Sequence, residues 1–246
     1  MSSSKIPHAP SGDRRFQTTH WSLVIAAGDR EHADSQAALE QLCRDYWYPV
    51  FAFIRRRVAD AHEAQDLTQA FFARLLEKNY LADARRERGR FRTFLLTATQ
   101  RFVTKEWAKA RAQKRGGGRV PLSLDFASGE TRYAIEPADQ TTPEREFDRR
   151  WALQLLQLVD QQLRDEHTRS GKADEFEQLK PFVAGEPAET YEQLAQRLSI
   201  SAGAARTAVY RLRQRFRELI RAEIAKTVAT EADIADEVRR LFDALA

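Results

Sequence analysis

Apolar residues recur at three- and four-residue steps along most of this chain, and that spacing constrains the fold more than any other feature. In the segment 35–58 the apolar positions that follow this step are Ala38, Leu42, Tyr46, Val50, Phe53 and Ile54. The spacing places them on one face of an α-helix, which Pro49 is expected to kink or divide. No sustained strand alternation and no Asn-Gly or Asp-Gly hairpin turn occurs, so the sequence predicts an all-α protein.

The segment 62–75 is a second amphipathic helix with two distinct sides. Its apolar stripe contains Ala64, Leu67, Phe71 and Leu75. The opposite side carries Glu63, Asp66, Gln69 and Ala70. This polar side combines two acids with an amide and an alanine, and its composition raises the question of which partner it faces.

Other helices are marked by caps, prolines and periodicity. Thr19 and Gly28 bracket a short predicted helix, and 90–115 continues as a longer one. Pro143 stands at the first turn of another helix. The apolar stripe of that helix runs through Phe147, Trp151, Leu155, Leu158 and Leu163. A further amphipathic helix is predicted within 226–246.

Composition divides the chain into five parts. Residues 1–15 are rich in Ser and Pro and are predicted to be disordered. Residues 116–142 contain three consecutive glycines and no sustained period, which indicates a flexible acidic linker. The linker separates two predicted helical domains, 16–115 and 143–221, and an acidic helical extension follows at 222–246.

The net charge of +4 conceals strong local asymmetry. Residues 80–119 contain twelve Lys and Arg against three acids, and 200–221 contain six Arg against one Glu. By contrast, 120–148 contain seven acids and two Arg. Two basic helical segments joined by an acidic one are typical of a nucleic-acid-binding protein.

The segment 190–216 reads as a helix-turn-helix. Thr190 and Gln193 form a capping box, the residues Leu-Ser-Ile make the turn, and Ser201 caps a second, basic helix. The apolar positions of that helix are Ala205, Val209, Leu212 and Phe216. Such a helix fits the DNA major groove. The candidate DNA contacts are Ser201, Arg206, Thr207, Tyr210 and Arg211. A plain helical hairpin with an exposed basic face is the alternative.

The segment 90–115 combines aromatic and basic residues. Arg101, Lys105 and Lys109 follow one another at four-residue steps and form a ridge that suits a nucleic-acid backbone. Aromatic rings in such a segment either stack on unpaired bases or pack in the core. We expect the rings of Phe91, Phe94 and Phe102 to belong to the core and the ridge to be exposed.

In order and spacing, these parts resemble the extracytoplasmic-function sigma factors of bacterial RNA polymerase. The segment beginning ALEQLCRDYWYPVFAFIRRRVADAHEAQDLTQAFFARLLEK is similar to the start of sigma region 2. GRFRTFLLTATQRFVTKEWAKARAQKR resembles the promoter-melting segment, and ETYEQLAQRLSISAGAARTAVYRLRQRFREL resembles region 4. The resemblance covers roughly residues 36–221.

The resemblance implies a transcription initiation factor that binds core RNA polymerase and promoter DNA. Region 2 would bind the polymerase clamp through Glu63, Asp66, Gln69 and Ala70. It would meet the promoter −10 element through Arg88, Arg90, Arg92, Arg101, Lys105 and Lys109. Region 4 would read the −35 element through the candidate contacts named above, and the acidic linker would pass through the polymerase cleft.

The chain departs from the family pattern on its clamp helix. Where the family usually has two further acids, this chain has Gln65 and Ala70, which should weaken docking. One branch of the family works with Ser/Thr kinases, and phosphorylation of Thr68 would add about −1.5 to −2 charges. We therefore take Thr68 as a candidate phosphosite, with a kinase or an anti-sigma factor as a further partner.

Other function classes find little support. The five histidines lack metal-ligand spacing, and neither a phosphate-binding loop nor a nucleophile elbow occurs, so we expect no enzyme, no metal and no cofactor. The lone Cys43 is expected to be a small buried residue. No apolar run could span a membrane, so we expect a cytoplasmic protein. A stand-alone helix-turn-helix regulator that binds DNA without polymerase is the alternative function.

Overall fold

A computed structural model describes residues 35–77, 90–113, 142–184, 189–228 and 230–246. Every secondary-structure element in these ranges is an α-helix, which confirms the all-α prediction. The predicted short helix after Thr19, the predicted disordered start and nearly all of the predicted linker lie outside the described residues. Within the described ranges, no helix combines the length and the apolar run that crossing a bilayer requires.

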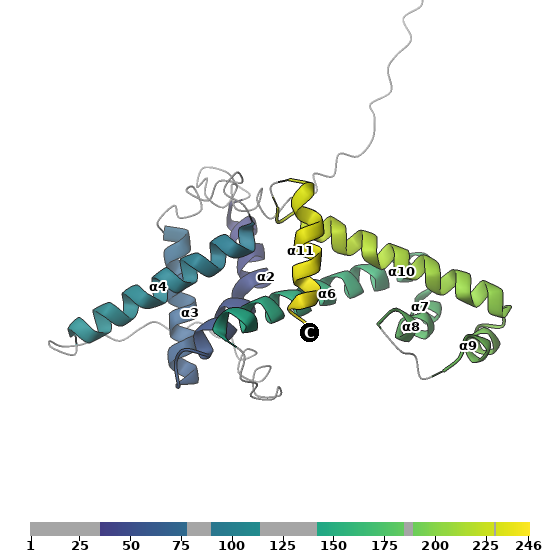
Figure 1. Cartoon of the computed structure of the whole chain (residues 1–246), viewed down its shortest axis with the longest axis horizontal. Coiled ribbons are helices and arrows are strands. Elements are labelled where there is room, and N and C mark those ends of the chain that lie inside the picture. The colour runs from purple at the N-terminus through teal and green to yellow at the C-terminus, as the bar shows by residue number, and fades with distance from the viewer. Residues whose placement is uncertain (1–34, 78–89, 114–141, 185–188, 229) are drawn as a thin grey trace, which may run out of the picture.

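One end of the molecule is built from α2 (Ser35–Arg55), α3 (Ala61–Glu77) and α4 (Phe91–Gln113). They pack against one another at the left of Figure 1. Pro49 lies inside α2, and the helix continues past it, so Pro49 does not divide this segment, and the predicted kink stays a prediction. Residues 50–54 are all buried, and this burial outweighs the roughly 3 kcal/mol that a proline costs inside a helix.

Aromatic rings fill the interior of this end. Phe91 meets Tyr46 edge to face at 5.0 Å between ring centroids, and Phe102 meets Phe71 in the same way at 5.6 Å. Phe91 and Phe102 are buried, as predicted, whereas Phe94 is only half-buried. Phe91 and Phe102 are therefore packing residues of the bundle and are not available as stacking platforms for bases. Cys43 is half-buried at the edge of the same core.

The longest helix, α6 (Pro143–Arg169), connects the two ends of the molecule. Pro143 occupies its first turn, as predicted, and the Thr142 hydroxyl accepts a bond from the amide of Arg145. The first half of α6 runs antiparallel to α2, where Gln154 donates to the carbonyl of Arg44 at 3.0 Å. Its second half packs on α10 (Ala202–Ala225). Helices α2 and α6 thus lie on opposite sides of the domain boundary predicted at residue 143, yet they pack against each other.

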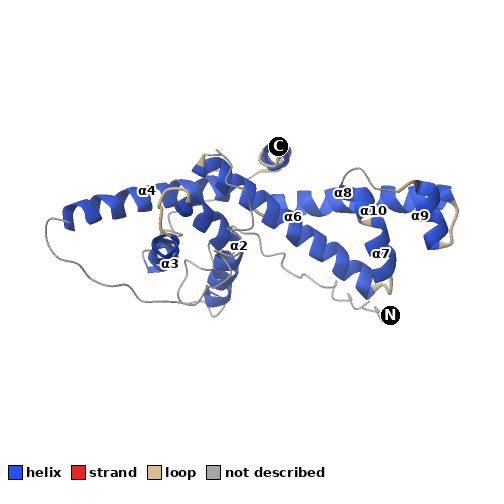
Figure 2. Ribbon diagram, turned by 90° about the horizontal axis from the view of Figure 1, so that it is seen from below, coloured by secondary structure: helices blue, strands red, loops and turns tan. Residues whose placement is uncertain are grey.

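The other end contains α7 (Ala173–Leu179), α8 (Pro181–Ala184), α9 (Tyr191–Leu198) and the start of α10. They lie at the right of Figure 1. Figure 2 shows α6 and α10 as the two long helices that run from this group toward α2 and α4. The last helix, α11 (Ala232–Asp243), is the predicted amphipathic tail helix, and it packs across both α10 and α6.

The apolar stripe predicted for α6 is correct at four of its five positions. Phe147, Trp151, Leu155 and Leu163 are buried, but Leu158 is 40% exposed, and Val159 fills the core position beside it at 0%. The reason is that α6 packs on α2, α7, α10 and α11 along its length, so its buried face turns from one partner to the next.

A matched pair of substitutions tests this assignment of the α6 core. We expect Val159→Ala to lower the free energy of unfolding by about 2 kcal/mol, because it leaves a cavity in a closed site. Leu158→Ala should cost less than about 0.5 kcal/mol, because the side chain is already in contact with water. Urea unfolding followed by circular dichroism measures both values, and a larger loss for Leu158→Ala would contradict the assignment.

Candidate functional site

The four residues predicted to bind polymerase lie together on the outer face of α3. Glu63, Asp66 and Ala70 are exposed, and Gln69 is half-buried beside them. The helix begins just after Asp60, whose carboxylate accepts a bond from the amide of His62 at 2.8 Å. Because the opposite face of α3 is buried in the bundle, this acidic and amide face is the one that α3 can offer to a partner.

Thr68 lies on the other side of α3, in the core. Its side chain is 0% exposed, and its hydroxyl donates to the carbonyl of Ala64 at 2.7 Å. A kinase would therefore reach this hydroxyl only if α3 unfolded or left the bundle. Phosphorylation of Thr68 stays a prediction, and the fold places a substantial energetic barrier in front of it.

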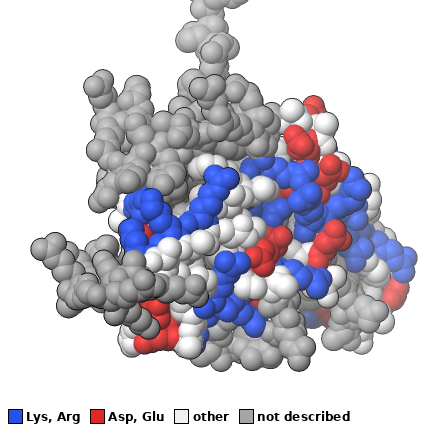
Figure 3. All heavy atoms as spheres, turned by 60° about the vertical axis from the view of Figure 1, so that its left-hand side comes forward, with Lys and Arg blue, Asp and Glu red and all other residues white. Residues whose placement is uncertain are grey.

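The basic ridge of α4 is exposed, as predicted. Arg101, Lys105 and Lys109 all face solvent, and Lys109 pairs with Glu106 at 2.7 Å. Glu106 also accepts a bond from Arg74 of α3 at 3.1 Å, which fixes the ridge to the neighbouring helix. Figure 3 shows this end of the molecule, where Lys and Arg atoms form several patches with smaller acidic patches between them.

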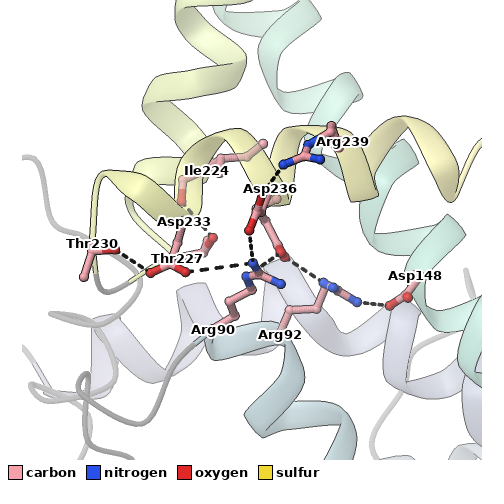
Figure 4. Close-up of polar contacts among 10 residues, drawn as sticks. Arg90, Arg92, Asp148, Ile224, Thr227, Thr230, Asp233, Asp236 and Arg239 are labelled. Atoms are coloured by element: carbon pink, nitrogen blue, oxygen red, sulfur yellow. Dashed lines mark hydrogen bonds and ion pairs between the residues drawn. The ribbon is translucent and has the colours of Figure 1, made fainter.

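The remaining arginines predicted for the −10 element occupy different surroundings. Arg88 lies outside the described residues. Arg90 and Arg92, at the start of α4, point toward α11, as Figure 4 shows. Arg92 is only 4% exposed, and its Nε donates to Glu237 of α11 at 2.9 Å. Its Nη1 donates to Asp148 of α6, so one guanidinium joins three helices.

Glu237 is the centre of this cluster. Its side chain is 0% exposed, and Arg90 Nε lies 3.0 Å from the second carboxylate oxygen, Oε2. That contact is electrostatic, since Oε2 accepts no well-aligned hydrogen bond among the described residues. Burial works against the charge on Arg92, but Asp148 and Glu237 outweigh it and raise the pKa of the guanidinium above its usual value. Arg92 therefore stays charged in the interior.

Sequence reasoning did not identify Glu237 or Asp148 as partners of these arginines. One signal was available for Glu237: it stands between Ile234 and Leu241 on the apolar stripe of the predicted tail helix. A carboxylate on an apolar stripe requires a buried partner. No pattern in the sequence shows that the partner comes from a helix 145 residues earlier in the chain.

The predicted −35 residues lie at the far end of the molecule, on α9 and α10. The capping box of Thr190 and Gln193 is present, and Ser199 takes the left-handed conformation that turns the chain, with φ 54°. Ser201 caps α10 by accepting a bond from the amide of Ala204 at 3.2 Å. A three-residue turn thus joins the two helices, but it consists of Ser199, Ile200 and Ser201 and not of the predicted Leu-Ser-Ile, because Leu198 is the last residue of α9.

The other four residues of this set share the outer face of α10. Arg206, Thr207, Tyr210 and Arg211 are all exposed, and Tyr210 is exposed to 60%. Arg206 pairs with Glu192 of α9 at 2.9 Å and lies over the Tyr191 ring at 5.6 Å. The Thr207 hydroxyl donates to the carbonyl of Gly203. The structure brings this set together and keeps it apart from the residues on α3 and α4.

Residues 42–113 match the family model for sigma-70 region 2, a segment that runs from α2 to the end of α4. The match supports a sigma-70 family sigma factor, a class of non-enzymatic transcription factors that act in transcription initiation. Helices α6 to α11 lie beyond it. The searches of curated proteins and of solved structures returned no match.

The class also implies the partners of the matched segment. Sigma region 2 implies binding to core RNA polymerase and to promoter DNA. Among the described residues, no group of three His, Cys, Asp or Glu side chains is placed to hold a metal ion. The exposed candidate surfaces are the acidic and amide face of α3 and the basic ridge of α4, whereas Arg90 and Arg92 at the start of α4 are largely covered.

The buried position of Glu237 generates a stability prediction. We expect Glu237→Ala to lower the free energy of unfolding by about 3 kcal/mol, because Arg92 would keep a buried charge with one partner fewer. Asp243→Ala, on the exposed side of the same helix, should cost less than about 0.5 kcal/mol. Thermal and urea unfolding of the two variants measure the difference, and similar losses would show that Glu237 is not a structural centre.

Proposed function

We propose that this chain is a transcription initiation factor of the extracytoplasmic-function type, which binds core RNA polymerase and directs it to promoters with −10 and −35 elements. The observation that carries the proposal is the coincidence of the region 2 match with one compact unit. That unit, α2 to α4, presents an acidic face on α3 and a basic ridge on α4. The protein would act in the bacterial cytoplasm, where RNA polymerase works.

Docking on polymerase is the first proposed step. Glu63 and Asp66 place two carboxylates on the exposed face of α3, where a basic surface of the polymerase clamp can meet them. Gln65 and Ala70 take the positions where the family usually has acids, so fewer charges support the contact here. Asp66 would therefore carry a larger share of the binding than it does in a more acidic relative.

Promoter recognition would use both ends of the molecule. The ridge of Arg101, Lys105 and Lys109 would follow the backbone of the −10 strand. The outer face of α10 would enter the major groove at the −35 element, with α9 across the DNA backbone. An exposed Arg211 can pair with a guanine edge or a phosphate, and Arg206 can do so once it leaves Glu192.

The acidic face of α3 is tested by a charge reversal. Asp66→Lys should reduce co-purification with core polymerase about tenfold, because a cation would face a basic partner. Asp165→Lys is the matched control, since it makes the same change at an exposed position of α6. Pull-down with purified core enzyme measures both, and equal retention of the two variants would exclude α3 as the docking face.

The outer face of α10 is tested in transcription. Arg211→Ala should weaken promoter-dependent run-off transcription about tenfold, since one good base or phosphate contact is worth roughly 1–3 kcal/mol. Arg221→Ala is the control, because this exposed arginine lies on the same helix but about 15 Å farther from the N-terminal half of α10, where the −35 contacts are proposed. Templates selected with the wild-type protein and core polymerase serve as the probe. An equal effect of the two substitutions would exclude this face.

The alternative, a stand-alone helix-turn-helix regulator, makes a different prediction in the same assay. Such a protein would select specific duplex DNA without core polymerase, whereas a sigma factor should do so only with it. The region 2 match favours the sigma factor, because a stand-alone regulator has no need of that unit. Regulation by a Ser/Thr kinase or an anti-sigma factor stays a prediction, and a kinase acting at Thr68 would have to meet an opened α3.

A further inference from the structure

We propose that α11 is an internal competitor for promoter DNA: its carboxylates hold the arginines at the start of α4 and must leave before those arginines can engage the −10 strand. This inference rests on the proposed function. It concerns residues 226–246, which lie outside the region 2 match. It assigns a role to the acidic extension that the promoter-binding proposal leaves unexplained.

The first support is an excess of carboxylates around one guanidinium. Arg90 has Glu237 at 3.0 Å, Asp236 at 3.6 Å and Asp233 at 3.9 Å. Glu237 also pairs with Arg92, Arg92 also pairs with Asp148, and Asp236 also pairs with Arg239, so this cluster still holds four carboxylates against three guanidinium groups. Several anionic oxygens around an arginine are also what a nucleic-acid backbone supplies, so α11 presents to Arg90 the chemistry of phosphates.

The second support is that the extension binds the backbone of α4 as well as its side chains. The amide of Phe91 donates to the carbonyl of Thr227 at 3.1 Å, in the turn between α10 and α11. The start of α4 is thus held by a backbone bond and by Glu237 together, and Figure 4 shows Arg90 and Arg92 on this side of α11. DNA that approached Arg90 from this side would meet α11 first.

The third support is that the acids differ in burial. Glu237 is fully buried and contributes to the stability of the fold, whereas the side chains of Asp233 and Asp236 are 36% and 49% exposed. Solvated pairs of this kind contribute little to stability. They can therefore be removed without unfolding the helix, and they can give way to a stronger anion. These two aspartates are the residues to change.

The test compares two full-length double variants with the same net charge. Asp233→Asn with Asp236→Asn removes the two solvated carboxylates near Arg90. Glu231→Gln with Asp243→Asn removes two exposed carboxylates from the start and end of α11, outside the ion pairs to Arg90. Because the net charges are equal, non-specific attraction of DNA is matched between the two proteins. Circular dichroism checks that both keep their helix content.

The probe is a fluorescein-labelled single strand of twenty deoxythymidines, with binding followed by anisotropy at low salt. We expect the first variant to bind about fivefold more tightly than the control variant, since removing a competitor raises the fraction of molecules with Arg90 available. Equal affinities, including no detectable binding by either variant, would overturn the proposal.

A second measurement distinguishes an α11 that leaves α4 when the promoter binds from an α11 that stays packed on α4. In a complex of wild-type protein, core polymerase and selected promoter DNA, the amides of 230–246 should exchange with deuterium about tenfold faster than in the free protein. Unchanged or slower exchange would show that α11 stays in place and would overturn the proposal. Failure of the wild type to bind core polymerase at all would instead reject the proposed function, so the two failures are distinguishable.

Discussion

The guanidinium of Arg92, at the start of α4, lies between Asp148 of α6 and Glu237 of α11, and the packing of these three helices on one another depends on this link. A charge buried to this extent is tolerated only when its partners are fixed in place. The same three helices enclose apolar residues around it, including Phe91, Trp151 and Leu241. The network therefore specifies one arrangement of α4, α6 and α11 more than it adds net stability.

Helix α6 carries that arrangement along the molecule. Near its start, Glu144 pairs with Arg57, just after α2, at 2.7 Å, and near its end Glu166 pairs with Arg215 of α10 at 2.6 Å. The Arg215 hydrogen bonds lower the pKa of Glu166, so this pair persists at neutral pH. One continuous helix thus packs on α2 at one end of the molecule and on α10 at the other.

The same arrangement has a functional consequence. The proposed −35 face of α10 and the ridge of α4 are exposed at opposite ends, whereas Arg90 and Arg92 are covered by the extension. In the free protein, the α10 face and the α4 ridge are therefore accessible to DNA, whereas Arg90 and Arg92 are not. Opening α11 would cost the Glu237 pairs, and binding to polymerase and promoter would have to supply that energy.

Much of the local structure was predictable because it depends on neighbouring residues. The helical periodicity, the capping box at Thr190, the N-cap at Ser201 and the start at Pro143 all involve partners within four positions. The exposed candidate residues on α3, on the α4 ridge and on α10 were found for the same reason. Pro49 does not divide α2, because the burial of residues on both sides of it outweighs the local cost of a proline.

The sequence by itself determined the helices, their ends, the charged segments and the region 2 pattern. Only the tertiary structure decided that Thr68 is buried, that Val159 and not Leu158 fills the core, and that Arg92 meets Glu237. These outcomes depend on which helix packs on which face, and helices far apart in the chain make that choice. Local patterns carry no information on such pairings. A buried charged residue requires a partner of opposite charge, but the sequence around it does not show which residue that partner is.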